Sequence, residues 1–340
     1  MISLFALLPV VLFLGCLYYM DSFKLVRVRL LLLCLGWGVA AAGLALLLNG
    51  TVADYYSLNS VELSRFVAPV TEEVIKMTLI VYLVLRLKVG FIIDAAICGF
   101  AIGTGFAVAE NLWYYLQLGG DFDLLLAAVR GFGTALMHGG TVALGAIIMI
   151  EGAHRNRKTA GALFGLFGAI FFHALFNQFV LNPLLQTLLI ISLLPLALFL
   201  IFLYANRNLS QWLEIEFNNE VELLAMIRKG EFKKSKAGNY LASIRDYFPK
   251  ETIFDMYCFV SLWLELSIKA KRNMLLKESG IPMLIEEDIP DKITELKLLR
   301  RQIGKAGEMA LMPLIRLNYR DLWQLEQWEE TRSDQKNLST

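Results

Sequence analysis

The 340-residue chain has only four cysteines, and no two of them are spaced as a pair. Three of the four lie in apolar runs, where a free thiol packs as a small hydrophobic group. The sequence therefore indicates neither a disulfide framework nor a zinc knuckle. It also lacks the H-E-x-x-H motif that places two zinc-binding histidines on one helix face. The cysteines are Cys16, Cys34, Cys98 and Cys258.

Charge is scarce in the first part of the chain. Residues 1–205 hold 11 Lys and Arg and 10 Asp and Glu, whereas residues 206–340 hold 21 of each kind. This division predicts a membrane domain over residues 1–205 and a polar helical tail over residues 206–340. The tail has no net charge, and nucleic-acid binding requires a clustered basic surface. We therefore expect no nucleic-acid partner.

Apolar runs of about 20 residues, the length that crosses a bilayer, fill the first part. No positive charge precedes the first run, which excludes the pattern of a cleaved signal peptide. The sequence predicts an all-α polytopic bundle of about seven transmembrane helices, followed by a small soluble helical domain. The seven runs cover residues 2–20, 30–48, 67–85, 90–117, 124–150, 159–181 and 184–204.

Lys and Arg are unevenly distributed among the turns that join these runs. The turns at residues 21–29, 86–88 and 151–158 contain eight of them, while the alternate loops contain one, Arg65. Excess Lys and Arg mark the cytoplasmic side of a membrane. We therefore expect a multi-pass protein of the cell membrane with its N-terminus outside and its tail in the cytoplasm.

The tail has amphipathic periodicity and no Ser/Gly-rich linker. It contains no catalytic motif and is the expected docking site for any cytoplasmic partner. The predicted helices cover residues 210–229, 239–248, 252–277, 291–303 and 317–330.

Ionisable residues interrupt the apolar runs. Glu72, Glu73 and Lys76 lie in the third run, at helical spacings that place both carboxylates near the ammonium. An ionised group in a bilayer costs about 2.5–3.5 kcal/mol on insertion scales, so such residues indicate a functional site. The alternative is an interfacial helix start, with Thr71 as its N-cap.

Other polar residues lie in the fourth to sixth runs. Glu110 lies late in the fourth run, His138 in the fifth, and His173 and Asn177 one turn apart in the sixth. Under the predicted orientation, these residues and those of the third run share one depth, from the bilayer centre outward. We expect Arg130 to extend toward the interface instead.

Such a group has several chemical uses. A carboxylate or histidine can activate water as a general base while another group stabilises an oxyanion, and amide hydrolysis requires both roles. The alternative is zinc, with Glu110, His138 and His173 as ligands. Buried acids and histidines also line proton-coupled transporters and channels. An inactive membrane scaffold is the third hypothesis.

Four motifs, in order and on separate predicted helices, resemble those of the PrsW intramembrane proteases. The resemblance covers residues 60–180 and extends distantly to the Abi/CAAX-prenyl proteases, whose second motif has His where this chain has Glu110. The motifs are E-E-x-x-K (Glu72, Glu73, Lys76), F-x-x-x-E-N (Phe106, Glu110, Asn111), H-x6-G (His138, Gly145) and H-x-x-x-N (His173, Asn177).

The resemblance implies a multi-span membrane peptidase. The founding type makes the first, extracytoplasmic cut in a membrane-bound anti-sigma factor, so a membrane-anchored protein in the bilayer is the expected substrate. The family is often called a metalloprotease, whereas its relatives are described as glutamate-dependent, and we commit to no cofactor.

The leading hypothesis gives each candidate catalytic residue a role. Glu72 or Glu73 activates water, Glu110 and His138 assist, and Lys76 tunes the glutamate pair. His173 and Asn177 polarise the carbonyl group or hold the oxyanion.

Cysteine labelling of intact cells tests the topology. Cysteines placed near Asp54 and Asp121 should react with an impermeant reagent from outside, because the loops there lack the basic residues that mark the cytoplasmic side. Cysteines near Arg157 and Lys336 should react only after permeabilisation. Reversed labelling would contradict both the topology and an outward-facing site.

Overall fold

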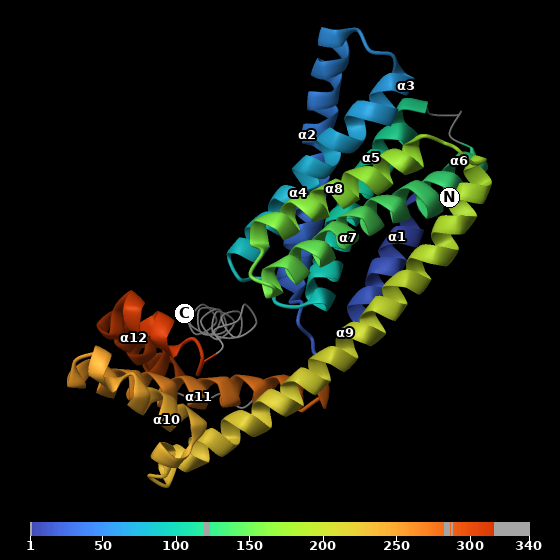
Figure 1. The fold of residues 1–340 in the computed structure, drawn as a ribbon. Coiled ribbons are helices and arrows are strands. Elements are labelled where there is room, and N and C mark those ends of the chain that lie inside the picture. Colours follow the sequence, from blue (N-terminus) through green and yellow to red (C-terminus); the bar gives the residue numbers. More distant parts are fainter. Residues whose placement is uncertain (1, 119–122, 282–285, 287, 316–340) are drawn as a thin grey trace, which may run out of the picture. The chain divides into compact units, whose positions relative to one another are not determined.

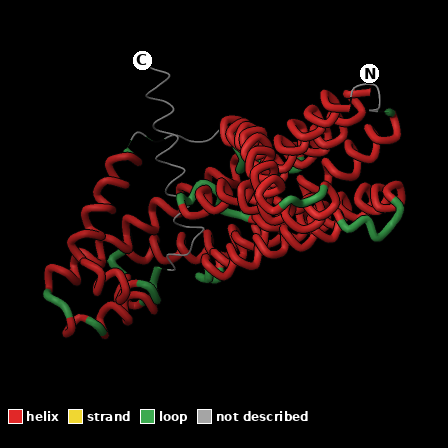
Figure 2. Tube along the Cα trace, turned by 90° about the horizontal axis from the view of Figure 1, so that it is seen from above, coloured by secondary structure: helices red, strands yellow, loops and turns green. Residues whose placement is uncertain are grey.

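The computed structural model describes residues 2–118, 123–281, 286 and 288–315. These residues form helices and the turns between them, and none of them lies in a strand (Figure 2). The all-α class predicted from the sequence is therefore confirmed. The chain divides into two compact units, Met1–Asn206 and Arg207–Thr340.

The first unit contains the apolar helices of the bundle and two short π-helical segments, η1 and η3. Its elements are α1 (Ile2–Tyr19), α2 (Val28–Tyr56), α3 (Ser60–Glu62), η1 (Leu63–Val67), α4 (Ala68–Leu85), α5 (Ile92–Leu118), α6 (Leu124–Ala128), η3 (Val129–Thr134), α7 (Ala135–His154), α8 (Lys158–Asn177) and the first part of α9 (Pro183–Arg228).

Five helices of the described chain are long and apolar enough to cross a membrane. They are α2, α5, the continuous stretch Leu124–His154, α8 and α9. A membrane bundle is confirmed, but the predicted count of seven spans is not. Helix α4 carries three ionisable side chains within its 18 residues, and the described apolar part of α1, Ala6–Tyr19, is short.

The second unit forms its own apolar core around α11, with Met256 and Leu266 fully buried. The predicted helix over 317–330 lies outside the described residues, and those over 239–248, 252–277 and 291–303 have counterparts. The elements after α9 are η4 (Phe232–Lys234), α10 (Lys236–Ser243), η5 (Arg245–Tyr247), α11 (Lys250–Glu278) and α12 (Ile289–Leu311).

One predicted boundary in the chain is wrong. The runs at 184–204 and 210–229 form a single helix, α9, rather than two. Neither Gly nor Pro occurs between them, so nothing in the local sequence ends the first helix before the second begins.

Helix α5 is the most buried of the candidate spans. It packs against α2 on one side and α7 on the other, and α7 packs in turn against α8 (Figure 1). Helix α4 packs against α2 and α8. Four of these helices, α4, α5, α7 and α8, carry the polar residues that the sequence placed at one depth.

Glycines allow α5 and α7 to approach at backbone distance. A Cβ atom on Gly103 would lie 2.2 Å from the carbonyl oxygen of His138, and one on Gly99 would lie 2.7 Å from that of Val142. No side chain fits at either position. The close contact places the backbone of His138 directly against α5.

The π-helical segments precede the two helices that carry much of the polar cluster. Segment η1 joins α3 to α4, and η3 joins α6 to α7. Each extra residue in a helix turn rotates the next part of the helix by about 100°, the angle between neighbours in an α-helix. The two segments therefore set which faces of α4 and α7 point inward.

A substitution at Gly103 tests the α5–α7 contact. Gly103→Ala should lower the stability of the folded protein by about 1–3 kcal/mol, because its Cβ meets backbone that cannot move aside easily. Gly43→Ala on α2 is the matched control, since a Cβ there meets nothing within 4 Å. Thermal unfolding in detergent measures both. Equal midpoints would contradict the close packing.

Candidate active site

Helix α4 brings three ionisable side chains into the interior of the bundle. Glu72 is 8% exposed, and Glu73 and Lys76 are fully buried. The helix does not begin at Thr71, because α3 and η1 precede α4 without a break. The alternative of an interfacial helix start is therefore wrong for these residues.

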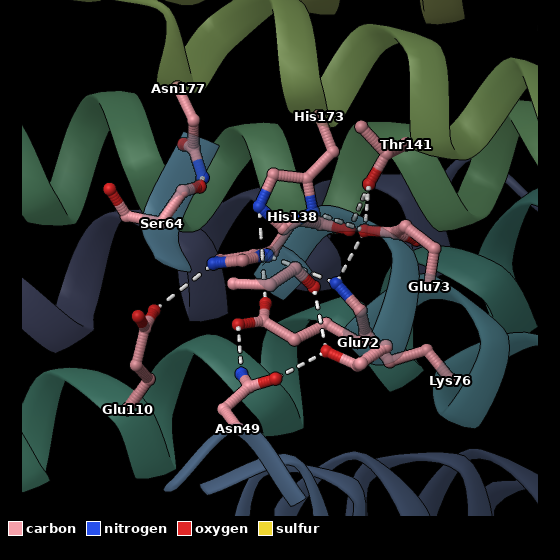
Figure 3. A network of polar contacts seen from close by, with 12 residues as sticks. Asn49, Ser64, Glu72, Glu73, Lys76, Glu110, His138, Thr141, His173 and Asn177 are labelled. Carbon is pink, nitrogen blue, oxygen red and sulfur yellow. Dashed lines mark hydrogen bonds and ion pairs between the residues drawn. The ribbon is translucent and has the colours of Figure 1, made fainter. Parts of the chain in front are cut away.

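Glu73 is the centre of the polar network drawn in Figure 3. Its Oε1 atom lies 2.6 Å from Lys76 Nζ, 2.7 Å from His173 Nδ1 and 3.2 Å from the Thr141 hydroxyl. Three donors from three helices thus converge on one buried oxygen. This convergence satisfies a carboxylate that would otherwise be costly to bury.

The hydrogen bonds assign the tautomer of His173. An ionised Glu73 can only accept, so Nδ1 of His173 carries the hydrogen. In the neutral ring, the lone pair is then on Nε2, which lies 3.9 Å from Glu72 Oε2. That carboxylate oxygen is buried and has no hydrogen-bond partner within the described part of the chain. Two acceptors therefore face one another.

His138 has the opposite tautomer. The Lys76 ammonium has only donors and lies 3.1 Å from Nδ1, so Nδ1 accepts and Nε2 carries the hydrogen. Nε2 lies 3.0 Å from Oε2 of Glu110 and donates to it. Lys76 also lies 4.4 Å from the centroid of the Phe106 ring, a cation–π contact on the same side of the site.

Arg130 belongs to the site, contrary to the expectation that it extends to the interface. Its Nη2 lies 3.2 Å from Oε2 of Glu110, and its Nε donates to Asn111 at 3.0 Å. The guanidinium also lies over the ring of Tyr114, at 3.7 Å from the centroid. The π-helix η3 carries Arg130, which gives Glu110 the cationic partner that its neighbours in sequence do not supply.

Asn49 and Thr141 also belong to the site, although they were not predicted from the sequence. Asn49 on α2 donates to Glu72 Oε1 at 3.5 Å, a long contact, and accepts from the Thr71 hydroxyl at 2.5 Å. The feature in the sequence that could have indicated Asn49 is its position as a polar residue directly after an apolar run. Thr141 lies three residues after His138, on the same helix face, and donates to Glu73.

Asn177 directs its side-chain amide away from the cluster. The amide nitrogen donates to the backbone carbonyl of Ser64 in η1 at 2.8 Å. This hydrogen bond ties the end of α8 to the π-helix that precedes α4. A role in holding an oxyanion would require the hydrogen bond to break.

Two further polar residues lie at the other end of the bundle. Asp94 is 1% exposed, and its carboxylate accepts from the backbone N–H groups of Gly90, Phe91 and Ala95 at the start of α5. His154 contacts the carbonyl oxygen of Gly90 at 2.8 Å. Both residues have structural roles, because these contacts shape the turn before α5.

Three candidate metal donors lie together, one atom each from Glu72, His138 and His173, within 4.8 Å of one another. Catalytic zinc sites use three such ligands. Glu110, which the sequence placed in this group, instead pairs with His138 and Arg130. His138 does not fit as a ligand in this arrangement, because its Nε2 carries a hydrogen and its Nδ1 faces an ammonium.

The comparisons with known proteins give one finding. A family model described as PrsW family intramembrane metalloprotease matches residues 27–205, which is more than half of the chain. The match includes every candidate catalytic residue. No curated protein and no solved structure matches the chain.

A double-mutant cycle tests the pairing of Arg130 with Glu110. Arg130→Met and Glu110→Gln should each lower stability, and the double variant should lose less than the sum. We expect a coupling of about 0.5–3 kcal/mol, the range for residues in direct contact. The exposed pair of Glu151 and Arg155, at 2.8 Å, is the control and should couple by less than about 1 kcal/mol.

Thermal unfolding in detergent measures all four proteins of each cycle. Strictly additive losses at Arg130 and Glu110 would show that the two side chains do not interact.

Proposed function

The chain belongs to the PrsW family of intramembrane proteases, and we propose that it hydrolyses peptide bonds of membrane-anchored proteins with water activated by Glu72 and His173. The observation that carries this proposal is the 3.9 Å separation of Glu72 Oε2 and His173 Nε2. One water molecule can donate a hydrogen bond to each of two acceptors at that distance. Glu73 orients the His173 ring by accepting a hydrogen bond from its other nitrogen, Nδ1.

Glu72 is the proposed general base. It takes a proton from the water while the water oxygen attacks the carbonyl carbon of the scissile peptide bond. The C–N bond then breaks, and the proton passes from Glu72 to the departing nitrogen. One water is consumed, and a carboxyl group and an amine are released. Proton transfer of this kind contributes about 10²–10⁴-fold to rate.

His138 is the proposed oxyanion donor. Its Nε2–H donates to Glu110 at 3.0 Å in the free site, and it serves the oxyanion once the oxyanion replaces that carboxylate as its acceptor. The Lys76 ammonium lies 3.1 Å from the other ring nitrogen and adds positive charge behind the ring. Preorganised donors of this kind act more strongly in a site of low dielectric constant.

This mechanism uses the carboxylate, imidazole and ammonium groups of the protein itself. The family description names a metal, but the tautomer of His138 leaves only Glu72 and His173 with a lone pair directed toward each other. Three protein ligands are the rule for a catalytic zinc ion. We therefore route no step through a metal.

The Lys and Arg distribution supports a cut near the outer side of the bilayer. It orients the N-terminus outside, the tail inside the cell, and Glu72 in the outer part of its helix. The proposed reaction is accordingly a first, extracytoplasmic cut of a substrate anchored in the cell membrane, with the tail available to a cytoplasmic partner.

The variant Glu72→Gln tests the base. It keeps the shape of the side chain and removes the proton acceptor, so cleavage of a single-span substrate in liposomes should fall by about 100-fold or more with the fold intact. Glu214→Gln, on an exposed part of α9, is the control and should cleave at the wild-type rate. A folded Glu72→Gln protein with wild-type activity would remove Glu72 from the reaction.

Metal removal tests the mechanism separately. After exhaustive chelation, cleavage should stay within about 2-fold of the untreated rate, because no proposed step needs an ion. Mass spectrometry of the purified protein should find far less than one zinc per chain. Loss of activity on chelation, with recovery on adding zinc, would contradict the metal-free mechanism and leave the peptidase function standing.

A further inference from the structure

An apolar cavity of about 590 Å³ lies between α7, α8 and α9, within the first unit. We call it the α9 groove. All but two of its lining side chains are apolar or glycine, and the exceptions are Thr141 and Gln186. Its wall includes Gly140, Leu144, Phe172, Leu193 and Ala197.

The groove and the proposed catalytic cluster share a wall. Thr141 lines the groove and donates to Glu73 at 3.2 Å. Phe172 lines it as well and directly precedes His173 in α8. A group bound in the groove therefore lies one side chain away from the residues that orient the proposed attacking water.

The size of the groove restricts its occupant. A spanning helix is about 10 Å wide and 30 Å long, which is far more than 590 Å³ can hold. The volume instead falls in the range of about 300–1,000 Å³ that is typical of sites for small groups. It suits a few large apolar side chains of an unwound segment.

The lining of the groove includes a small residue on each of α7 and α9. A Cβ atom on Gly140 would lie 2.7 Å from a methyl carbon of Leu194, so the Leu194 side chain of α9 packs against the α7 backbone at that point. Ala197 lies three residues further along α9, on the same face, and its short side chain lines the groove. A larger residue there would fill the space.

We propose that the α9 groove is a specificity subsite that accepts large apolar side chains of the substrate next to the scissile bond. This inference rests on the proposed peptidase function. The groove supplies the apolar surface, and its Thr141 end leads to the water-activating pair. A substrate with Leu or Phe beside the cut buries that side chain in the groove, whereas one with Ala does not.

A substrate series in liposomes tests the proposal. Single-span substrates that carry Ala, Leu, Phe or Trp at each position flanking the cut are compared by kcat/KM. Wild type should prefer Leu or Phe over Ala at one position by about 10-fold or more, the discrimination that apolar pockets give. Ala197→Phe should abolish that preference and leave cleavage of the Ala substrate within about 3-fold.

Two further variants complete the design. Leu196→Phe is the matched control, since Leu196 adjoins Ala197 but does not line the groove, and it should keep the wild-type preference. Leu144→Ala enlarges the groove and should shift the preference toward Trp. This second change keeps the test decisive if Ala197→Phe does not fold.

The outcomes are distinguishable. An unchanged preference in folded Ala197→Phe or Leu144→Ala overturns the subsite. An equal loss with every substrate also overturns it, and indicates that the groove holds a lipid chain or supports the fold. Failure of wild type to cleave any substrate overturns the proposed function, and the subsite with it.

Discussion

The buried ion pair between Glu73 and Lys76 is the interaction on which the site depends. Both side chains are fully buried, and their charged atoms are 2.6 Å apart. Burying two charges is costly unless their remaining hydrogen-bonding capacity is used. Glu73 uses it on His173 and Lys76 uses it on His138, so one ion pair on α4 gives the two histidines opposite tautomers. The proposed base and the proposed oxyanion donor depend on that difference.

The other helices of the bundle hold the residues around the ion pair in place. Gly103 lets α5 touch the backbone of His138, and Asn177 ties α8 to η1. Arg130 extends from η3 to Glu110, which holds the far side of the His138 ring. These contacts come from helices far apart in sequence, and each one fixes a neighbour of the ion pair rather than the pair itself.

The helices and most of the cluster were predictable from the sequence, because charges in apolar runs and helical spacing are local signals. Glu72, Glu73, Glu110, His138 and His173 were found in this way. Helical spacing also predicted Lys76 beside the glutamates, but the partners that come from other helices were not predicted. The inward direction of Arg130 depends on a π-helical turn, which no local pattern marks, and the contact of Asn49 with Glu72 depends on how α2 packs beside α4. Tertiary packing also decided the donor set for a metal, which includes Glu72 instead of Glu110.

The proposed mechanism depends on the protonation of the two histidines, which can be measured directly. Nitrogen-15 NMR of ring-labelled protein in lipid distinguishes Nδ1–H from Nε2–H, and a His154→Gln variant removes the third histidine signal. We predict one neutral ring of each kind, with His173 protonated on Nδ1 and His138 on Nε2, assigned by single substitution. Two rings of the same tautomer, or a zinc-shifted Nε2 signal on His138, would contradict the proposed roles of both residues.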